Sequence, residues 1–183
     1  MPAAEANASP YRIQVRDLVR KPGTHRTHSS VFPAPAVVGS DVIGVPEGSD
    51  ITLELSVETV TEGIWVSGTV AAEAAGECGR CLDPVREAVS ATVAALYVYP
   101  DAEAEGDEDS VDLHEFDGDT LELEDVVRDA VVTSLPFTPL CGSDCPGLCD
   151  QCGARLADDP DHEHDVVDPR WSALQDLTEK KES

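Results

Sequence analysis

The chain has 183 residues, which suits one domain, or one domain with a small module. It carries 37 acidic and 12 basic side chains, a formal net charge of −25, and 41% of its residues are hydrophobic. No run approaches the roughly 18 consecutive apolar residues of a membrane span, and the first ten residues lack the basic and apolar blocks of a signal peptide. The composition argues against a membrane protein, a collagen-like chain and a secreted disulfide scaffold, and it favours the reducing cytoplasm.

The charge is distributed unevenly along the chain. Residues 1–30 hold five basic and two acidic side chains, a net charge of +3, which leaves −28 for the remainder. A nucleic-acid-binding protein usually presents a basic face to the phosphates. If this chain contacts RNA, we expect the contact at Arg12, Arg16, Arg20, Lys21 and Arg26. The alternative is that these side chains are the solvated face of an edge strand.

Several stretches alternate apolar and polar residues with a period of two, which is typical of half-buried strands. They are residues 11–16, 51–57, 64–70 and 89–99. We expect antiparallel strands, with a turn near Glu62 and Gly63, that curl into a barrel-like sheet. The prolines and glycines of residues 33–48 predict an irregular connection.

A helix is indicated for residues 122–135, where apolar residues recur at steps of three and four. Asp119 and Glu122 resemble a capping box at its start, and Pro136 should end it. A second, short helix is expected to begin at Asp168.

These elements predict an α+β fold, with an antiparallel, barrel-like β-sheet, one packed helix and a Cys-rich, zinc-binding C-terminal region. We expect one domain over residues 11–177, between a flexible N-terminus at 1–10 and a flexible tail at 178–183. Within the domain, the acidic run 101–110 should be a solvated loop. Residues 137–167 form the segment that carries most of the candidate metal ligands.

All six cysteines fall in two places, which indicates metal chemistry in a reducing compartment. Zinc prefers four tetrahedral ligands drawn from cysteine and histidine, and a C-x2-C turn offers two thiolates to one ion. A C-x2-C pair stands between two predicted strands, and a second set of four cysteines, followed by two histidines, lies beyond the predicted helix. The candidate ligands are Cys78, Cys81, Cys141, Cys145, Cys149, Cys152, His162 and His164.

Eight ligands are enough for two tetrahedral Zn²⁺ sites, and more than one partition is open. One partition joins Cys78 and Cys81 to Cys141 and Cys145, and leaves the remaining four residues as a local second site. The rival partition joins the two C-x2-C pairs into a single zinc ribbon. Iron–sulfur ligation is a further alternative, and the two histidines could simply belong to a solvated polar loop.

Other chemistries are less well supported by the sequence. The C-G-R-C tetrapeptide resembles a redox motif, but no βαβ pattern surrounds it and Asp83-Pro84 follows it. There is no P-loop, GxSxG, HExxH or dinucleotide fingerprint, and Cys-rich zinc sites are usually closed and structural. We therefore expect no enzymatic activity and no small-molecule substrate.

The cysteine motifs resemble those of the YceD-like family, the domain of unknown function 177, also called large ribosomal RNA subunit accumulation proteins. The resemblance covers about residues 11–177. Its C-terminal Asp168-Pro-Arg-Trp171 looks like the actinobacterial branch. It rests on C-G-R-C-L at 78–82, L-P at 135–136, P-L-C at 139–141 and C-P-G-L-C-D-Q-C-G at 145–153.

The resemblance implies a cytoplasmic protein needed for normal accumulation of large-subunit ribosomal RNA. Together with the missing enzyme motifs, it leads us to expect a non-enzymatic factor that assists the accumulation or processing of this RNA, or ribosome assembly. Some relatives match the first pair and the positions of Cys141 and Cys145 but lack the second C-x2-C, which favours Cys78, Cys81, Cys141 and Cys145 as one site. Others end in Cys-x-Cys where this chain has His162 and His164. The implied partners are ribosomal RNA or a basic large-subunit ribosomal or assembly protein, for which the acidic chain would serve as an adapter.

Overall fold

The computed structural model describes residues 9–100, 113–116 and 118–164. Several sequence predictions lie outside these residues: the acidic loop, the second helix, the C-terminal tail and nearly all of the N-terminal segment. The chain divides into two compact units, residues 1–79 with 83–141 and residues 80–82 with 142–183.

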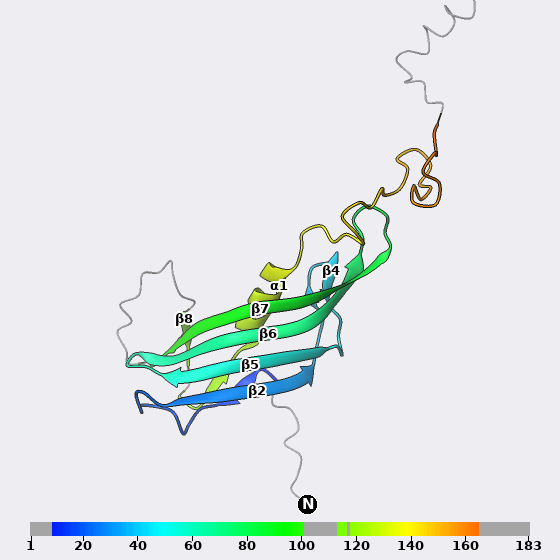
Figure 1. Ribbon diagram of the computed structural model, residues 1–183. Helices are drawn as coiled ribbons and strands as arrows, with labels where there is room; N and C mark the ends of the chain where they lie inside the picture. Colours follow the sequence, from blue (N-terminus) through cyan, green and yellow to red (C-terminus); the bar gives the residue numbers. More distant parts are fainter. Residues whose placement is uncertain (1–8, 101–112, 117, 165–183) are drawn as a thin grey trace, which may run out of the picture. The chain divides into compact units, whose positions relative to one another are not determined.

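The first unit combines strands with the one helix found among the described residues (Figure 1). The longest strands coincide with the stretches of strict alternation, and shorter strands lie between them. In chain order the elements are β1 (Arg12–Gln14), β2 (His25–Pro33), β3 (Val38–Gly39), β4 (Ile43–Val45), β5 (Asp50–Thr59), β6 (Gly63–Glu77), β7 (Pro84–Val98), β8 (Leu113–Glu115), β9 (Thr120–Glu122) and α1 (Glu124–Ser134).

Seven of the described strands form one curled sheet centred on β6. β2, β5, β6, β4 and β3 follow one another in that order, while β7 pairs with β6 and with β8. β1 and β9 form a separate two-stranded sheet, with Ile13 opposite Leu121. The pairing of β7 with β8 is parallel, so the sheet is mostly rather than wholly antiparallel. The predicted α+β class is otherwise confirmed.

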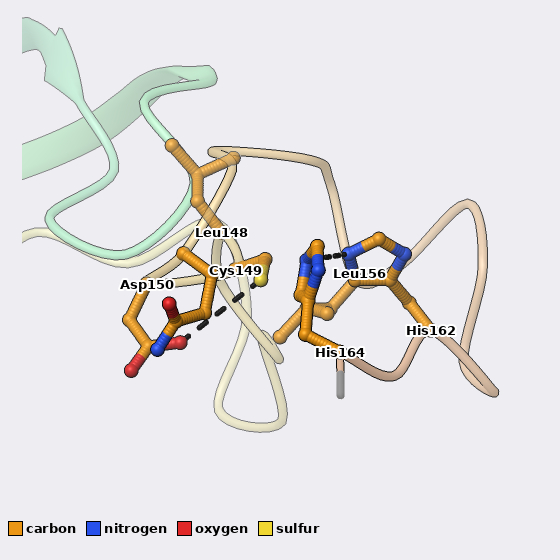
Figure 2. Close-up of a pocket in the computed structure, with 7 residues that line it drawn as sticks. Leu148, Cys149, Asp150, Leu156, His162 and His164 are labelled. Atoms are coloured by element: carbon orange, nitrogen blue, oxygen red, sulfur yellow. Dashed lines mark hydrogen bonds between the residues drawn. The ribbon is translucent and has the colours of Figure 1, made fainter. Parts of the chain in front are cut away.

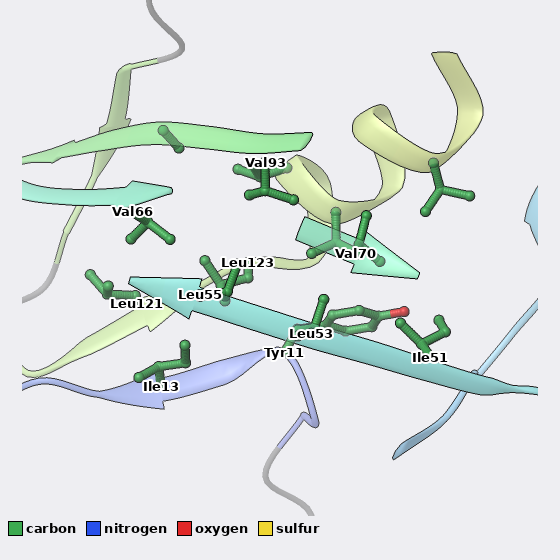
Figure 3. Close-up of a cluster of buried hydrophobic side chains, with 14 of the residues drawn as sticks. Tyr11, Ile13, Ile51, Leu53, Leu55, Val66, Val70, Val93, Leu121 and Leu123 are labelled. Atoms are coloured by element: carbon green, nitrogen blue, oxygen red, sulfur yellow. The ribbon is translucent and has the colours of Figure 1, made fainter. Parts of the chain in front are cut away.

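The buried apolar side chains of these elements gather in one core (Figure 3). On β5, Ile51, Leu53 and Leu55 are buried, while Glu54 between them is exposed. This follows from the strand itself, because successive side chains point to opposite faces of a sheet. The alternation predicted for this strand is confirmed, and it fixes which face of the sheet meets the helix.

Gly68 of β6 lies close against the backbone of β5, and its φ is +157°. A Cβ at this position would lie 2.1 Å from the carbonyl oxygen of Glu54 and 2.8 Å from the Cα of Leu55. Backbone atoms cannot move aside as a flexible side chain can. The pairing therefore requires glycine here.

Some strands were not predicted from the sequence. β2 has polar residues on both faces, and Phe32 is its only buried residue, so it shows no hydrophobic alternation. The segment predicted as an irregular connection contains β3 and β4, which are too short to show a period. These strands are placed by pairing: β2 runs antiparallel to β5, and β4 runs antiparallel to β6.

The predicted helix is confirmed with slightly shorter bounds. α1 buries Val126, Val127 and Val131, which lie on one face of the helix. It ends at Ser134 because Leu135 is extended, with φ −72° and ψ 142°. A residue that precedes proline favours this conformation, and Pro136 follows.

The predicted capping box is wrong. The N-cap residue is Leu123, whose side chain has no oxygen to accept a backbone hydrogen bond. Glu122 is the last residue of β9, and the carboxylate of Asp119 instead accepts two hydrogen bonds from the guanidinium of Arg16. Only Leu123 separates strand β9 from helix α1. Asp119 and Glu122, which resembled a capping box, lie before the helix and pair with residues of the N-terminal segment instead.

The second unit is held by turns within its described part. An isolated antiparallel bridge joins Leu148 to Arg155. Beside it, the N–H of Cys149 donates to the carbonyl of Ala154 at 2.7 Å, and the N–H of Leu156 donates to that of Gly147 at 3.1 Å. These bonds fold residues 147–156 into a short, tight hairpin.

Candidate metal centres

Cysteine and histidine side chains gather in two groups within the described residues. In each group the candidate ligand atoms lie within 4.8 Å of one another. A tetrahedral ion with bonds of about 2.0–2.3 Å separates its ligands by roughly 3.3–3.8 Å, so the donor sets and spacing suit metal binding. The groups are Cys78, Cys81, Cys141 and Cys145, and Cys149, Cys152, His162 and His164.

All eight predicted ligand residues fall into these groups, and the grouping corresponds to the two-site partition. In the first group, Cys78, Cys81 and Cys145 are buried and Cys141 is exposed. Leu82 follows the C-x2-C pair with φ +63°, a left-handed conformation that residues with a side chain seldom adopt. An all-cysteine donor set is typical of structural zinc.

The second group is more open and mixes two thiols with two imidazoles. The Nε2 atoms of His162 and His164 each lie 3.2 Å from the Sγ of Cys152, and 2.8 Å from each other. The rings meet edge to face, with centroids 4.6 Å apart (Figure 2). Both histidines thus direct the same nitrogen toward the Cys152 thiol, as tetrahedral ligation by Nε2 requires.

The backbone prepares Cys149 to act as a ligand. The N–H groups of Cys152 and Gln151 hydrogen-bond to its sulfur and lower the pKa of the Cys149 thiol to about 6. Gly153, at φ +73°, continues the turn, and its N–H donates to the Cys149 carbonyl at 2.9 Å. Because a thiolate is the form that binds metal, this turn provides it at neutral pH.

A cavity of about 510 Å³ opens beside the second group. Its lining residues are Leu148, Cys149, Asp150, Gln151, Leu156, His162 and His164 (Figure 2). The group is therefore accessible to solvent and to small chelators, in contrast to the mostly buried cysteines of the first group.

One residue beside the second group was not singled out from the sequence. The Oδ2 of Asp159 lies 3.7 Å from the Nδ1 of His162, on the side of the ring away from the thiols. In the sequence, the only indication of this contact is an acidic residue three positions before a histidine. It was obscured because the segment D-D-P-D-H-E-H-D contains several such acids.

The predicted RNA-contact residues lie in or near β1 and β2, and most are engaged with acidic groups. Arg12 pairs with Glu122 at 2.6 Å, and Arg16 pairs with Asp119 at 2.7 Å. Across the segment the two positive charges therefore face two carboxylates. Exposed pairs of this kind contribute about 0.2–1 kcal/mol each, so they reduce the local positive charge without locking the side chains.

The remaining basic residues of this segment behave similarly. Arg26 pairs with Asp17 at 3.1 Å, and the Nζ of Lys21 donates to the Asp17 carbonyl at 2.7 Å. The guanidinium of Arg20 lies 5.4 Å from the centroid of the Tyr99 ring. Each of the five basic side chains thus lies against another residue of the first unit.

In the part of the chain that the structure describes, no helix has the length and apolar character to cross a membrane. The fold and the two groups define a class: a curled, mostly antiparallel sheet with one helix and cysteine-rich groups that could hold metal ions. Residues 66–178 match the family described as large ribosomal RNA subunit accumulation protein YceD. The chain belongs to this family, and the resemblance noted in its cysteine motifs is confirmed.

Relatives with high similarity come from mycobacteria. Proteins of Mycobacterium bovis and Mycobacterium tuberculosis are 41% identical over 170 residues, which cover 93% of this chain and 82% of each relative. A Mycobacterium leprae protein is 40% identical over 171 residues, covering 92% of this chain and 78% of its own. Each is described as uncharacterized. No solved structure matches the chain significantly.

Proposed function

We propose that this protein is a non-enzymatic, zinc-binding factor of the cytoplasm that assists the accumulation of large-subunit ribosomal RNA. The observation that carries the process is membership of the YceD family. The observation that supports zinc is the gathering of two four-ligand groups rich in cysteine. Each would surround its ion with four protein ligands, an arrangement typical of structural rather than catalytic zinc.

Within this process, the direct contact is with a basic large-subunit ribosomal or assembly protein. The chain carries a net charge of −25, and three arginines of its one basic segment already face carboxylates. RNA binding would require those pairs to exchange for phosphates on a chain that repels phosphate at long range. A basic protein is attracted by the same field.

The cellular role is tested by deleting the gene and measuring the ratio of large- to small-subunit ribosomal RNA. The ratio is expected to fall, and the wild-type chain should restore it. A chain with Cys81→Ser and Cys152→Ser, which removes one ligand from each group, is expected to restore it poorly. An unchanged ratio in the deletion strain would contradict the proposed process.

The choice of partner is tested by binding the intact chain to large-subunit ribosomal RNA and to basic large-subunit proteins at two salt concentrations. Neutralising the six acids of residues 101–109, which lie outside the described residues, is expected to weaken protein binding about tenfold at low salt. The variant R12Q/R16Q/R20Q should leave protein binding unchanged. RNA binding that falls steeply with salt and disappears in the arginine variant would instead establish RNA as the partner.

A further inference from the structure

Both ring nitrogens of His162 have a polar neighbour. Its Nε2 lies 3.2 Å from the Sγ of Cys152, and its Nδ1 lies 3.7 Å from the Oδ2 of Asp159. The backbone brings the two residues together, because the N–H of His162 donates to the Asp159 carbonyl at 3.2 Å and closes a turn. The carboxylate is thus attached to the same turn that presents the imidazole.

We propose that Asp159 is a positioning residue of the second group: its carboxylate, 3.7 Å from Nδ1 and just beyond hydrogen-bond distance, closes on the Nδ1–H of His162 when Nε2 binds a zinc ion. This inference rests on the proposed binding of zinc by that group. A neutral imidazole carries one N–H, and the partner of the other nitrogen decides which tautomer forms. A hydrogen bond from Nδ1–H to Asp159 would therefore select the tautomer that can ligate through Nε2.

A positioning residue of this kind affects the affinity for the metal ion rather than the stability of the fold. His162 keeps 20% of its side chain exposed and Asp159 keeps 64%, so their ion pair alone would add little to folding stability. A carboxylate that orients a ligating histidine, in contrast, typically changes metal affinity by about 10–100-fold, because it fixes the ring and increases its basicity. The two roles therefore predict different results.

Two other acids near the group lie beside different residues, and one of them supplies a control. Asp158 lies 3.6 Å from the Nε of Arg155, and Asp150 lies near the thiol of Cys149 rather than near an imidazole. Asp158→Asn removes the same charge from the same turn as Asp159→Asn, but it leaves the contact with His162 intact. A general electrostatic effect on the ion would lower affinity equally in both variants.

The test is a titration of the intact, metal-depleted chain with Co²⁺ in competition with a chelator, followed by its visible absorption. Subtracting the signal of a Cys149→Ser, Cys152→Ser chain isolates the second group. Asp159→Asn is expected to weaken Co²⁺ binding there about 10–100-fold, Asp159→Glu to recover part of the affinity, and Asp158→Asn to change it less than threefold.

Histidine NMR of the zinc-loaded chain gives a readout that a purely structural role would not move. The Nδ1–H proton of His162 should exchange slowly in the wild type and rapidly in Asp159→Asn, with His164 unaffected. Equal affinities in the wild type, Asp159→Asn and Asp158→Asn would overturn the role of Asp159. Failure of the wild-type second group to bind either ion would overturn the proposed zinc binding itself.

Discussion

Removal of metal by a chelator is expected to unfold the second unit while the sheet of the first unit persists. Among the described residues of the second unit, the only ladder contact is the bridge between Leu148 and Arg155, and the buried residues with an apolar or sulfur side chain are two candidate ligands, Cys81 and Cys145. So few contacts cannot offset the entropy of ordering the chain. Zinc binding in small structural sites contributes an apparent folding free energy of about 10–16 kcal/mol, which is enough to offset that entropy.

Amide hydrogen exchange measures this effect residue by residue. The amides of Cys149, Gly153 and Leu156, which are hydrogen-bonded in the second unit, should lose at least about 100-fold of their protection on chelation. The amides of β5 and β6 should keep theirs, because their ladder does not involve a metal ligand. Protection that survives chelation in both units would show that metal is not needed for the fold.

Zinc content provides the matched control. The wild-type chain is expected to carry two ions, and Cys149→Ser, Cys152→Ser to carry one. A single ion in the wild type would contradict the two-group arrangement, and a metal-free, folded protein would revive the redox interpretation of the C-x2-C pairs.

Alanine at Gly68 is expected to destabilise the first unit by about 3 kcal/mol or more. Its Cβ would meet the backbone of β5 at 2.1 Å, so the two strands would have to separate locally. The positive φ of +157° adds a conformational cost of about 1–3 kcal/mol for any residue with a side chain. Urea unfolding followed by circular dichroism measures the change.

Gly48→Ala separates the two contributions. Gly48 also has a positive φ, +82°, but a Cβ there would meet no atom within 4 Å. It should cost only about 1–2 kcal/mol, the conformational part alone. If the two variants were equally destabilised, the close approach of β5 and β6 at Gly68 would have no energetic consequence.

The sequence predicted the central strands and the helix because their signals are local. Ile51, Leu53, Leu55 and Val57 alternate without interruption, and all four are buried. β2 could not be predicted in this way, since its residues are polar on both faces and its order comes from pairing with β5. A local sequence pattern shows which residues of a strand are buried. Pairing with a distant segment, in contrast, produces no periodic pattern in the sequence of either strand.

The same distinction holds for the candidate site. The ligand residues were predictable because the geometry of one metal ion imposes short, regular spacings such as C-x2-C. The partners of the basic segment were not, because Arg12 and Arg16 pair with carboxylates 110 and 103 residues further along the chain. Only the fold shows that the segment that looked positive in isolation is largely balanced.

The pairing of β1 with β9 constrains the order in which the chain can fold. β5, β6 and β7 are joined by short hairpins, so their contacts are local, and local contacts form fastest. Arg12, in contrast, lies opposite Glu122, and this pair closes a loop of more than a hundred residues. During synthesis, β1 therefore stays without its partner strand until β9 has been translated. The part of the core formed by Ile13 and Leu121 is thus completed only after most of the chain has been synthesised.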